Sequence, residues 1–215
     1  MAVNFLFALT PLVKMPQVDI LFLEVTEWFT TVGKVTEEYG LVDEVMSKLY
    51  LMTGVSGSGK TTFAKEFAQK NNLRCLNIDN FYYATFGDEN MHKHEFDVWM
   101  MFYRAIEIAS RDSVDIIIDT NSPTISNRDE IYNWFGHMFS ENYMIYIYAP
   151  IELCLKNNTS RKRIIPQNEL IKMYNDYEVP HPDEARKWNK IYEVCNNNNV
   201  FSEMNEICTN EITIH

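Results

Sequence analysis

One eight-residue segment constrains the fold of this chain more than any other feature. Gly54-Val-Ser-Gly-Ser-Gly-Lys-Thr61 matches the complete pattern G-x-x-x-x-G-K-[ST]. Glycine lets the backbone curl so that several N–H groups converge on one phosphate. The Lys60 ammonium can then reach the β- and γ-phosphates, and the Thr61 hydroxyl can bind Mg²⁺. We therefore predict a nucleotide-binding loop made of Gly54, Ser56, Gly57, Ser58, Gly59, Lys60, Thr61 and Thr62.

The residues on either side of this loop support the interpretation. Residues 48–53 are mostly apolar, which is typical of a short buried strand. After the loop, apolar side chains recur at helical spacing at Phe63, Ala64, Phe67 and Ala68. The motif requires the order strand, glycine-rich loop, helix. A simple glycine-rich turn with an exposed lysine is the weaker alternative.

Length and composition fit one α/β domain with an additional segment: the chain has 215 residues, of which 46% are hydrophobic. The formal net charge of −11 argues against nonspecific binding to long nucleic acid, but it allows a local pocket for a nucleic-acid end. His92 and His94 have no cysteine nearby, so a solvated loop is a better interpretation than a metal site. The cysteines show no C-x-x-C spacing, which favours reduced thiols in a cytoplasmic protein over a disulfide framework: Cys75, Cys154, Cys195 and Cys208.

Residues 1–46 precede the strand of the loop, and we interpret them as an N-terminal extension that packs on the core or on a partner. Its apolar run, residues 5–13, lacks a basic flank and is too short to span a bilayer, so we expect no signal peptide and no membrane contact. Residues 18–25 are a candidate strand, and residues 36–48 are a candidate helix.

From residue 47 onward, predicted strands and helices alternate. This order is typical of a P-loop NTPase-type α/β fold, a doubly wound parallel sheet with helices on both faces, so we treat 47–215 as one domain. The predicted strands are 48–53, 74–78, 114–118, 143–148 and 190–195. Besides the helix after the loop, the predicted helices are 97–109, 126–139 (opened by a Ser126–Asp129 capping box), 150–158 and 166–177.

Two aspartates, Asp79 and Asp119, come directly after predicted strands. The carboxyl ends of parallel strands meet at one edge of a sheet, so we expect both aspartates beside the loop. A carboxylate next to the γ-phosphate can accept a proton from an attacking hydroxyl, which is the role we predict for Asp79. Asp119 can hold Mg²⁺ directly or through water. A capping or turn aspartate is the alternative for each.

Arg161, Lys162 and Arg163 form a compact basic cluster between two predicted helices. A basic segment there can close on the phosphates and stabilise moving charge, so we interpret residues 157–166 as a lid; a solvated charge run is the alternative. Arg128 lies at the start of a predicted helix, where a cation opposes the helix dipole. It either pairs with a nearby carboxylate or reaches a substrate phosphate.

Over residues 50–195 the sequence resembles the 5′-hydroxyl polynucleotide kinases and their P-loop relatives. The loop and the residues after it look like the opening of that family. Four further segments carry the resemblance: Asn77-Ile-Asp-Asn-Phe81, Ile117-Ile-Asp-Thr-Asn-Ser-Pro-Thr124 with Arg128, Leu155-Lys-Asn-Asn-Thr-Ser-Arg161 and Ile165–Tyr174. Segments 182–184 and 188–192 resemble the closing part of the wider group.

The resemblance implies a kinase that uses ATP and Mg²⁺, with Asp79 as general base, Arg161 as lid arginine, and Asp119, Asn121 and Arg128 on the substrate side. Its implied acceptor is the 5′-hydroxyl of a polynucleotide. Two departures from the family pattern weaken the case for that acceptor. Residues 81–85 contain no acceptor-binding arginine, and Asn157 replaces the first lid arginine. The alternatives are a nucleoside or nucleotide, a hydroxylated base in DNA, and a non-catalytic NTP-dependent switch that binds a protein partner.

Overall fold

The computed structural model describes residues 47–87, 94–161 and 164–207, which all belong to the unit Glu44–His215. The strands are β1 (Lys48–Thr53), β2 (Arg74–Asn77), β3 (Ile116–Asp119), β4 (Glu141–Tyr148), β5 (Lys190–Asn197), β6 (Val200–Phe201) and β7 (Asn205–Glu206). The helices are α2 (Lys60–Asn71), α3 (Ile78–Phe86), α4 (Glu95–Arg111), α5 (Ile125–Phe135), α6 (Ile151–Thr159) and α7 (Gln167–Asn175). Two 3-10 turns, η2 (Gly136–Met138) and η3 (Pro182–Arg186), complete the described elements.

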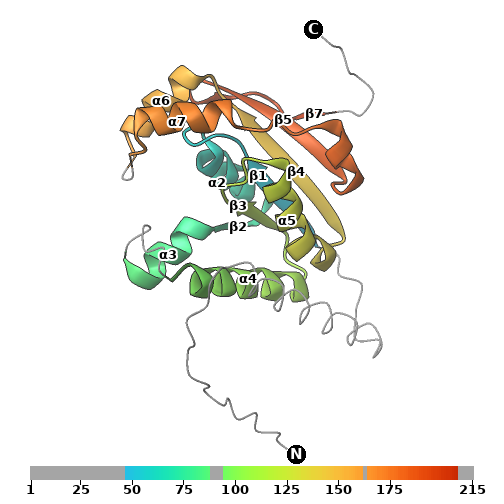
Figure 1. Ribbon diagram of the computed structural model, residues 1–215. Helices are drawn as coiled ribbons and strands as arrows, with labels where there is room; N and C mark the ends of the chain where they lie inside the picture. The colour runs from blue at the N-terminus through green and yellow to red at the C-terminus, as the bar shows by residue number, and fades with distance from the viewer. Residues whose placement is uncertain (1–46, 88–93, 162–163, 208–215) are drawn as a thin grey trace, which may run out of the picture. The chain divides into compact units, whose positions relative to one another are not determined.

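The strands form one sheet in the order β2-β3-β1-β4-β5-β6, with β7 also paired to β5 (Figure 1). The first five strands in this order are parallel. Among the strands that the structure describes, only the short strands β6 and β7 are antiparallel to their neighbour, which for both is β5. The strand that leads into the phosphate-binding loop, β1, therefore lies inside the sheet between β3 and β4. The predicted α/β fold of the P-loop NTPase type is confirmed.

Alternate residues of the five parallel strands pack against helices on opposite faces of the sheet. On β1, Leu49 and Leu51 belong to the core cluster that includes Phe102 of α4 and Phe135 of α5. Met52 belongs to the cluster on the other face, which contains the buried side chains of α2. This period-2 alternation is what a strand covered on both faces requires.

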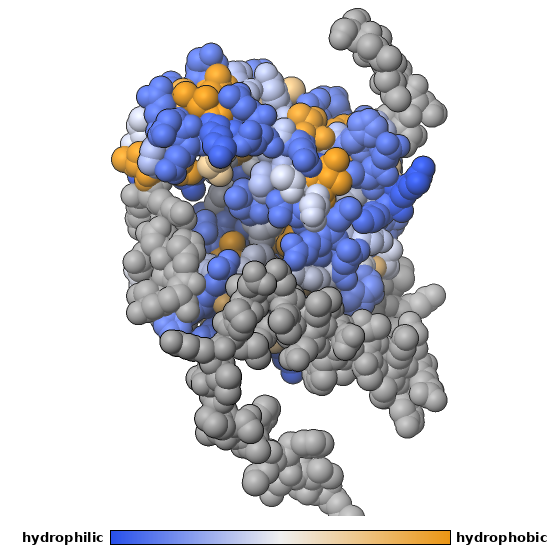
Figure 2. All heavy atoms as spheres, in the orientation of Figure 1, coloured by the Kyte–Doolittle hydropathy of each residue, from blue (hydrophilic) through white to orange (hydrophobic). Residues whose placement is uncertain are grey.

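The surface of the described residues is mostly hydrophilic on the face that Figure 2 shows. Its hydrophobic residues lie in small groups rather than in one large patch. Such scattered apolar groups are normal for a folded domain.

One boundary differs from the prediction in a way that concerns the site. Strand β2 ends at Asn77 rather than at Ile78, and the helix α3, which was not predicted, begins there. The Asn77 side chain accepts a hydrogen bond from the backbone N–H of Asn80 at 3.2 Å. This is an N-cap, which ends the strand and starts the helix. Asp79 therefore lies in the first turn of α3.

The predicted capping box at Ser126 is wrong. The N-cap of α5 is Thr124, which has an extended backbone and whose hydroxyl oxygen accepts from the N–H of Asn127 at 3.2 Å. The helix also ends at Phe135, earlier than predicted. The predicted cap lies two residues too late in the sequence, because Ser126 and Thr124 both have side chains that can cap a helix.

The candidate strand 18–25 and the candidate helix up to residue 46 lie outside the described residues, and Lys48 begins β1 instead of ending that helix. Lys162, Arg163, His92 and Cys208 also lie outside them. Within the described ranges, no helix has the length and apolarity needed to cross a membrane. The same ranges contain no group of three or more His, Cys, Asp or Glu side chains arranged to hold a metal ion.

Candidate active site

The loop between β1 and α2 needs its glycines. Gly57 has a φ of 84° and Gly59 a φ of 100°, both in the region that L side chains rarely adopt. A Cβ at Gly57 would lie 2.5 Å from the carbonyl oxygen of Cys154, and a Cβ at Gly59 would lie 2.7 Å from Asn196 Nδ2. The loop is therefore packed closely against α6 and against the end of β5.

Two asparagine side chains hold the loop from these neighbouring elements. Asn157 Nδ2, on α6, donates to the carbonyl oxygen of Gly57 at 2.9 Å. Asn196 Nδ2, on β5, donates to the carbonyl oxygen of Ser58 at 2.7 Å and is fully buried. Asn196 was not among the predicted site residues, and Asn157 was expected only as a departure from the lid motif. Neither residue carries a local signal, since each bond spans 100 residues or more.

Lys60 is half-buried at the start of α2, where its ammonium donates to the carbonyl oxygens of Gly54 at 2.7 Å and Val55 at 3.0 Å. Burial lowers the pKa of Lys60 below its ordinary value. The carboxylates of Asp119 and Asp79 act in the opposite direction, and the positive charge of Arg161 lowers the pKa further. The structure therefore brings all three predicted charged residues close enough to act on the Lys60 charge.

Asp119 connects the loop to the end of β3. One of its oxygens, Oδ2, accepts from the Thr61 hydroxyl at 2.6 Å and from Asn77 Nδ2 at 2.6 Å. The Asp119 side chain is nearly fully buried. A carboxylate and a hydroxyl at this distance are the hard oxygen ligands that Mg²⁺ accepts, usually with one or two carboxylates and several waters. The residues present therefore fit a magnesium ion.

Asp79 and Arg161 both follow Lys60 in the sequence, and both act on its charge. Asp79 is half-buried and follows β2, whose last residue, Asn77, is paired with Asp119. Arg161 is exposed and follows the end of α6, where its backbone N–H donates to the carbonyl oxygen of Asn158 at 3.3 Å. Their positions are compatible with the predicted base and with the predicted phosphate-contacting arginine.

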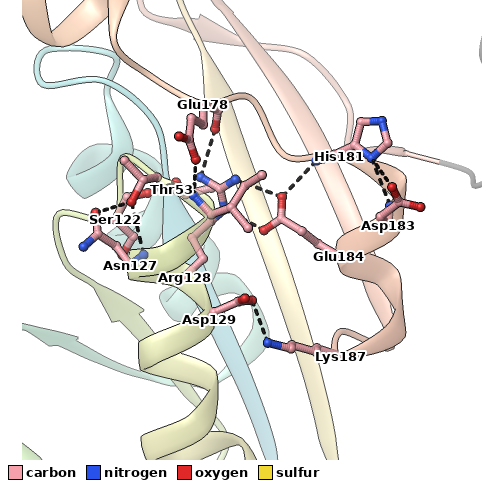
Figure 3. Close-up of polar contacts among 12 residues, drawn as sticks. Thr53, Ser122, Asn127, Arg128, Asp129, Glu178, His181, Asp183, Glu184 and Lys187 are labelled. Carbon is pink, nitrogen blue, oxygen red and sulfur yellow. Dashed lines mark hydrogen bonds and ion pairs between the residues drawn. The ribbon is translucent and has the colours of Figure 1, made fainter.

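Arg128 forms a buried ion pair (Figure 3). Its Nε and Nη2 each donate to a carboxylate oxygen of Glu184 at 2.8 Å, and its Nη1 donates to the carbonyl oxygen of Glu178 at 2.9 Å. The Arg128 side chain is 0% exposed. Of the two predicted alternatives, the structure has the carboxylate pair. Asn121, in contrast, is exposed at the sheet edge beyond Asp119.

A cavity of about 270 Å³ lies between α6 and the turn after β5. Cys154 and Asn196, which contact the phosphate-binding loop, do not line this cavity but are adjacent in sequence to residues that do. It is lined by Pro150, Glu152, Leu153, Lys156, Asn197 and Asn198.

Residues 49–180 match the protein family described as an AAA domain. The chain is 31% identical over 142 residues to an L-seryl-tRNA(Sec) kinase of Methanococcus maripaludis, with 61% of the chain and 53% of the relative covered. It is 25% identical over 146 residues to Protein kti12 of Schizosaccharomyces pombe, with 62% and 52% covered. The chain thus spans about half the length of the curated relatives it matches.

Among solved structures, a chain of the Pnkp1/Rnl/Hen1 RNA repair complex superposes with a TM-score of 0.57. The sequence identity is 21%, and the match covers 62% of this chain and 45% of the other. At that identity the likeness concerns the fold alone.

Proposed function

The chain belongs to this AAA-domain family, and on that premise we propose that it is an ATP-dependent phosphotransferase that moves the γ-phosphate to a hydroxyl acceptor. Lys60 and the loop amides hold the β- and γ-phosphates. Thr61 and Asp119 hold Mg²⁺, directly or through water, and the bound ion neutralises phosphate charge. Asp79 accepts the proton of the acceptor hydroxyl, and Arg161 stabilises charge on the transferred group.

In this reaction the acceptor oxygen forms a bond to the γ-phosphorus while the bond from that phosphorus to the β–γ bridging oxygen breaks. ADP leaves with the bond's electron pair, and the hydroxyl proton goes to Asp79. The observation that carries the proposal is the 2.6 Å hydrogen bond between Thr61 and Asp119. It links the phosphate-binding loop to the strand edge where Asp79 also lies.

The acceptor hydroxyl, we propose, is attached to a nucleic acid. The polynucleotide 5′-hydroxyl is one candidate, from the resemblance of the motifs. The hydroxyl of a seryl group carried by a tRNA is a second, because the M. maripaludis relative bears the name of such a kinase. The absence of an arginine from residues 81–85 favours the seryl group, since that hydroxyl has no neighbouring phosphate to be recognised.

The test is transfer of label from γ-labelled ATP to a panel of acceptors: 5′-hydroxyl oligonucleotides, seryl-tRNA, nucleosides and nucleotides. Asp79→Asn should abolish transfer while leaving ATP binding intact, and Lys60→Ala is the blank. Asp97→Asn is the matched control, because Asp97 also lies in the first turn of a helix but is exposed on α4. Full transfer by Asp79→Asn would remove the proposed base.

A non-catalytic NTP-dependent switch remains the second candidate function, because one of the curated relatives, Protein kti12, is not named as a kinase. A switch would bind or hydrolyse ATP without labelling any acceptor in the panel. We also propose a cytoplasmic location, supported by the three described cysteines, Cys75, Cys154 and Cys195, which are all free thiols.

A further inference from the structure

Residues 177–184, between α7 and β5, contact three parts of the structure that are distant in sequence (Figure 3). They reach the end of β1, the loop 119–124, which starts at the last residue of β3, and α5. The loop 119–124 contains Asp119 and the exposed Asn121, both predicted on the substrate side. The proposed function uses none of the contacts that residues 177–184 make.

The first contact is a pair of consecutive hydrogen bonds that runs from the Tyr177 hydroxyl through the Thr53 hydroxyl to the backbone of Ser122. Thr53 Oγ1, at the end of β1, donates its only proton to the carbonyl oxygen of Ser122 at 2.7 Å. The Tyr177 hydroxyl lies 2.8 Å from the same Thr53 oxygen, so Tyr177 must be the donor in that bond. Burial raises the pKa of Tyr177 to about 12, which keeps the donating proton in place. The Tyr177 ring stacks on Tyr146 of β4 at 5.5 Å.

The second contact fixes the other end of the loop. The backbone N–H of Glu178 donates to the carbonyl oxygen of Pro123 at 3.0 Å. The carboxylate of Glu178 accepts from the backbone N–H of Ile125 at 2.6 Å, at the first residue of α5. A carboxylate at a helix N-terminus is favourable because it meets unpaired N–H groups and the positive end of the dipole.

The third contact is the ion pair of Arg128 with Glu184, whose side chains are 0% and 4% exposed. Glu184 Oε1 also accepts from the N–H of His181 at 2.9 Å. A buried pair of this kind adds little net stability, because desolvation cancels most of the attraction. The pair can form, however, in only one arrangement of the residues around it. Here it fixes residues 178–184 against α5.

We propose that Tyr177 and Glu178 are positioning residues that hold the loop 119–124 in register with the phosphate-binding loop. Thr53 is the link, because it is bonded to Ser122 and Tyr177 and is followed directly by Gly54. This inference rests on the proposed function, since it gives the loop 119–124 the task of aligning the acceptor hydroxyl. It adds a specific role for residues that no motif marks.

The test compares Tyr177→Phe, which removes one hydroxyl and keeps the ring, with wild type. Tyr174→Phe is the matched control: Tyr174 lies on α7 and is bonded to Tyr148 instead of to this loop. Hydrogen–deuterium exchange of the amides in residues 120–128 should be at least tenfold faster in Tyr177→Phe than in wild type or Tyr174→Phe. Transfer assays should show at least a fivefold higher acceptor KM, with the ATP KM within twofold of wild type.

Unchanged exchange in residues 120–128, or equal acceleration across the whole sheet, would overturn the proposal. So would an ATP KM that rises as much as the acceptor KM. If wild type labels no acceptor, the proposed function fails, but the exchange measurement still decides whether the loop is held in this way. If Tyr177→Phe does not fold, Glu178→Ala against Glu178→Gln gives the same comparison, because glutamine keeps an acceptor for Ile125.

Discussion

At the scale of single residues, the charge on Lys60 can be tested directly. Its pKa is lowered from the ordinary lysine value of 10.5, mainly by burial. Phosphate binding stabilises the ammonium form. The affinity for nucleotide should therefore be highest on the acid side and fall as pH rises through the lowered pKa, before 10.5 is reached.

We expect the Kd for a non-hydrolysable ATP analogue to increase by up to tenfold per pH unit above that pKa. Binding measured by calorimetry between pH 7 and 10 checks this expectation. Lys60→Arg is the control, because a guanidinium stays charged over the whole range and should bind without the alkaline decline. An equal decline in Lys60→Arg would assign the effect to another group.

A second test at this scale concerns glycine. Gly57→Ala places a Cβ 2.5 Å from the Cys154 carbonyl oxygen, so either the loop or α6 must move. We expect nucleotide affinity to fall at least tenfold. Gly87→Ala is the matched control, because Gly87 also has a positive φ, 68°, but no atom lies within 4 Å of its Cβ position. The free energy of unfolding of that variant should fall by only about 1–2 kcal/mol, because alanine is strained in the left-handed conformation. The variant should still bind nucleotide normally.

At the scale of elements, two side chains near the start of α5 are of a type that can cap a helix, but they have different roles. Thr124 caps the helix, whereas Ser126 is an exposed residue inside the first turn. Thr124→Ala should lower the free energy of unfolding by about 1 kcal/mol. Ser126→Ala should change it by less than about 0.5 kcal/mol. Urea denaturation of both variants measures the difference, and equal losses would contradict the assignment of the cap.

Element positions were predicted best where one strong local pattern decided them. Strand β1 and the buried face of α2 have the predicted residues, since the glycine loop fixes the boundary between them. The helix α3 was missed, because Ile78 was taken as the end of the strand 74–78 and no helix was predicted between that strand and residue 97. The Asn77 side chain caps the start of this helix, and Gly87, in the left-handed conformation, ends it.

The candidate site was predictable to the extent that its residues follow strands. Asp79 and Asp119 lie at the expected sheet edge, and Thr61 lies beside Asp119. The partner of Arg128 was not predictable: Glu184 is 56 residues away, and no spacing relates the two. The same holds for Tyr177 and Thr53, whose bond joins residues 124 positions apart. Such contacts follow from the packing of the sheet rather than from any segment of sequence.

At the scale of the whole molecule, ligand binding should be visible as stability. A nucleotide that binds only the folded chain raises the free energy of unfolding by about 2.7 kcal/mol at 100 times its Kd. For a chain of this size that corresponds to a rise in Tm of roughly 5–10 °C. Differential scanning fluorimetry with ATP and Mg²⁺ should show this rise in wild type and a much smaller one in Lys60→Ala. Equal shifts in the two proteins would place the nucleotide elsewhere.

The bond from Asn196 to the carbonyl of Ser58 spans 138 residues. A ribosome adding 5–20 residues per second needs roughly 7–28 s to cover that distance. During that interval the growing chain already carries the complete glycine motif, yet the amide that braces it has not been made. The nascent polypeptide must therefore pass through a period in which its most recognisable segment cannot yet have its mature shape.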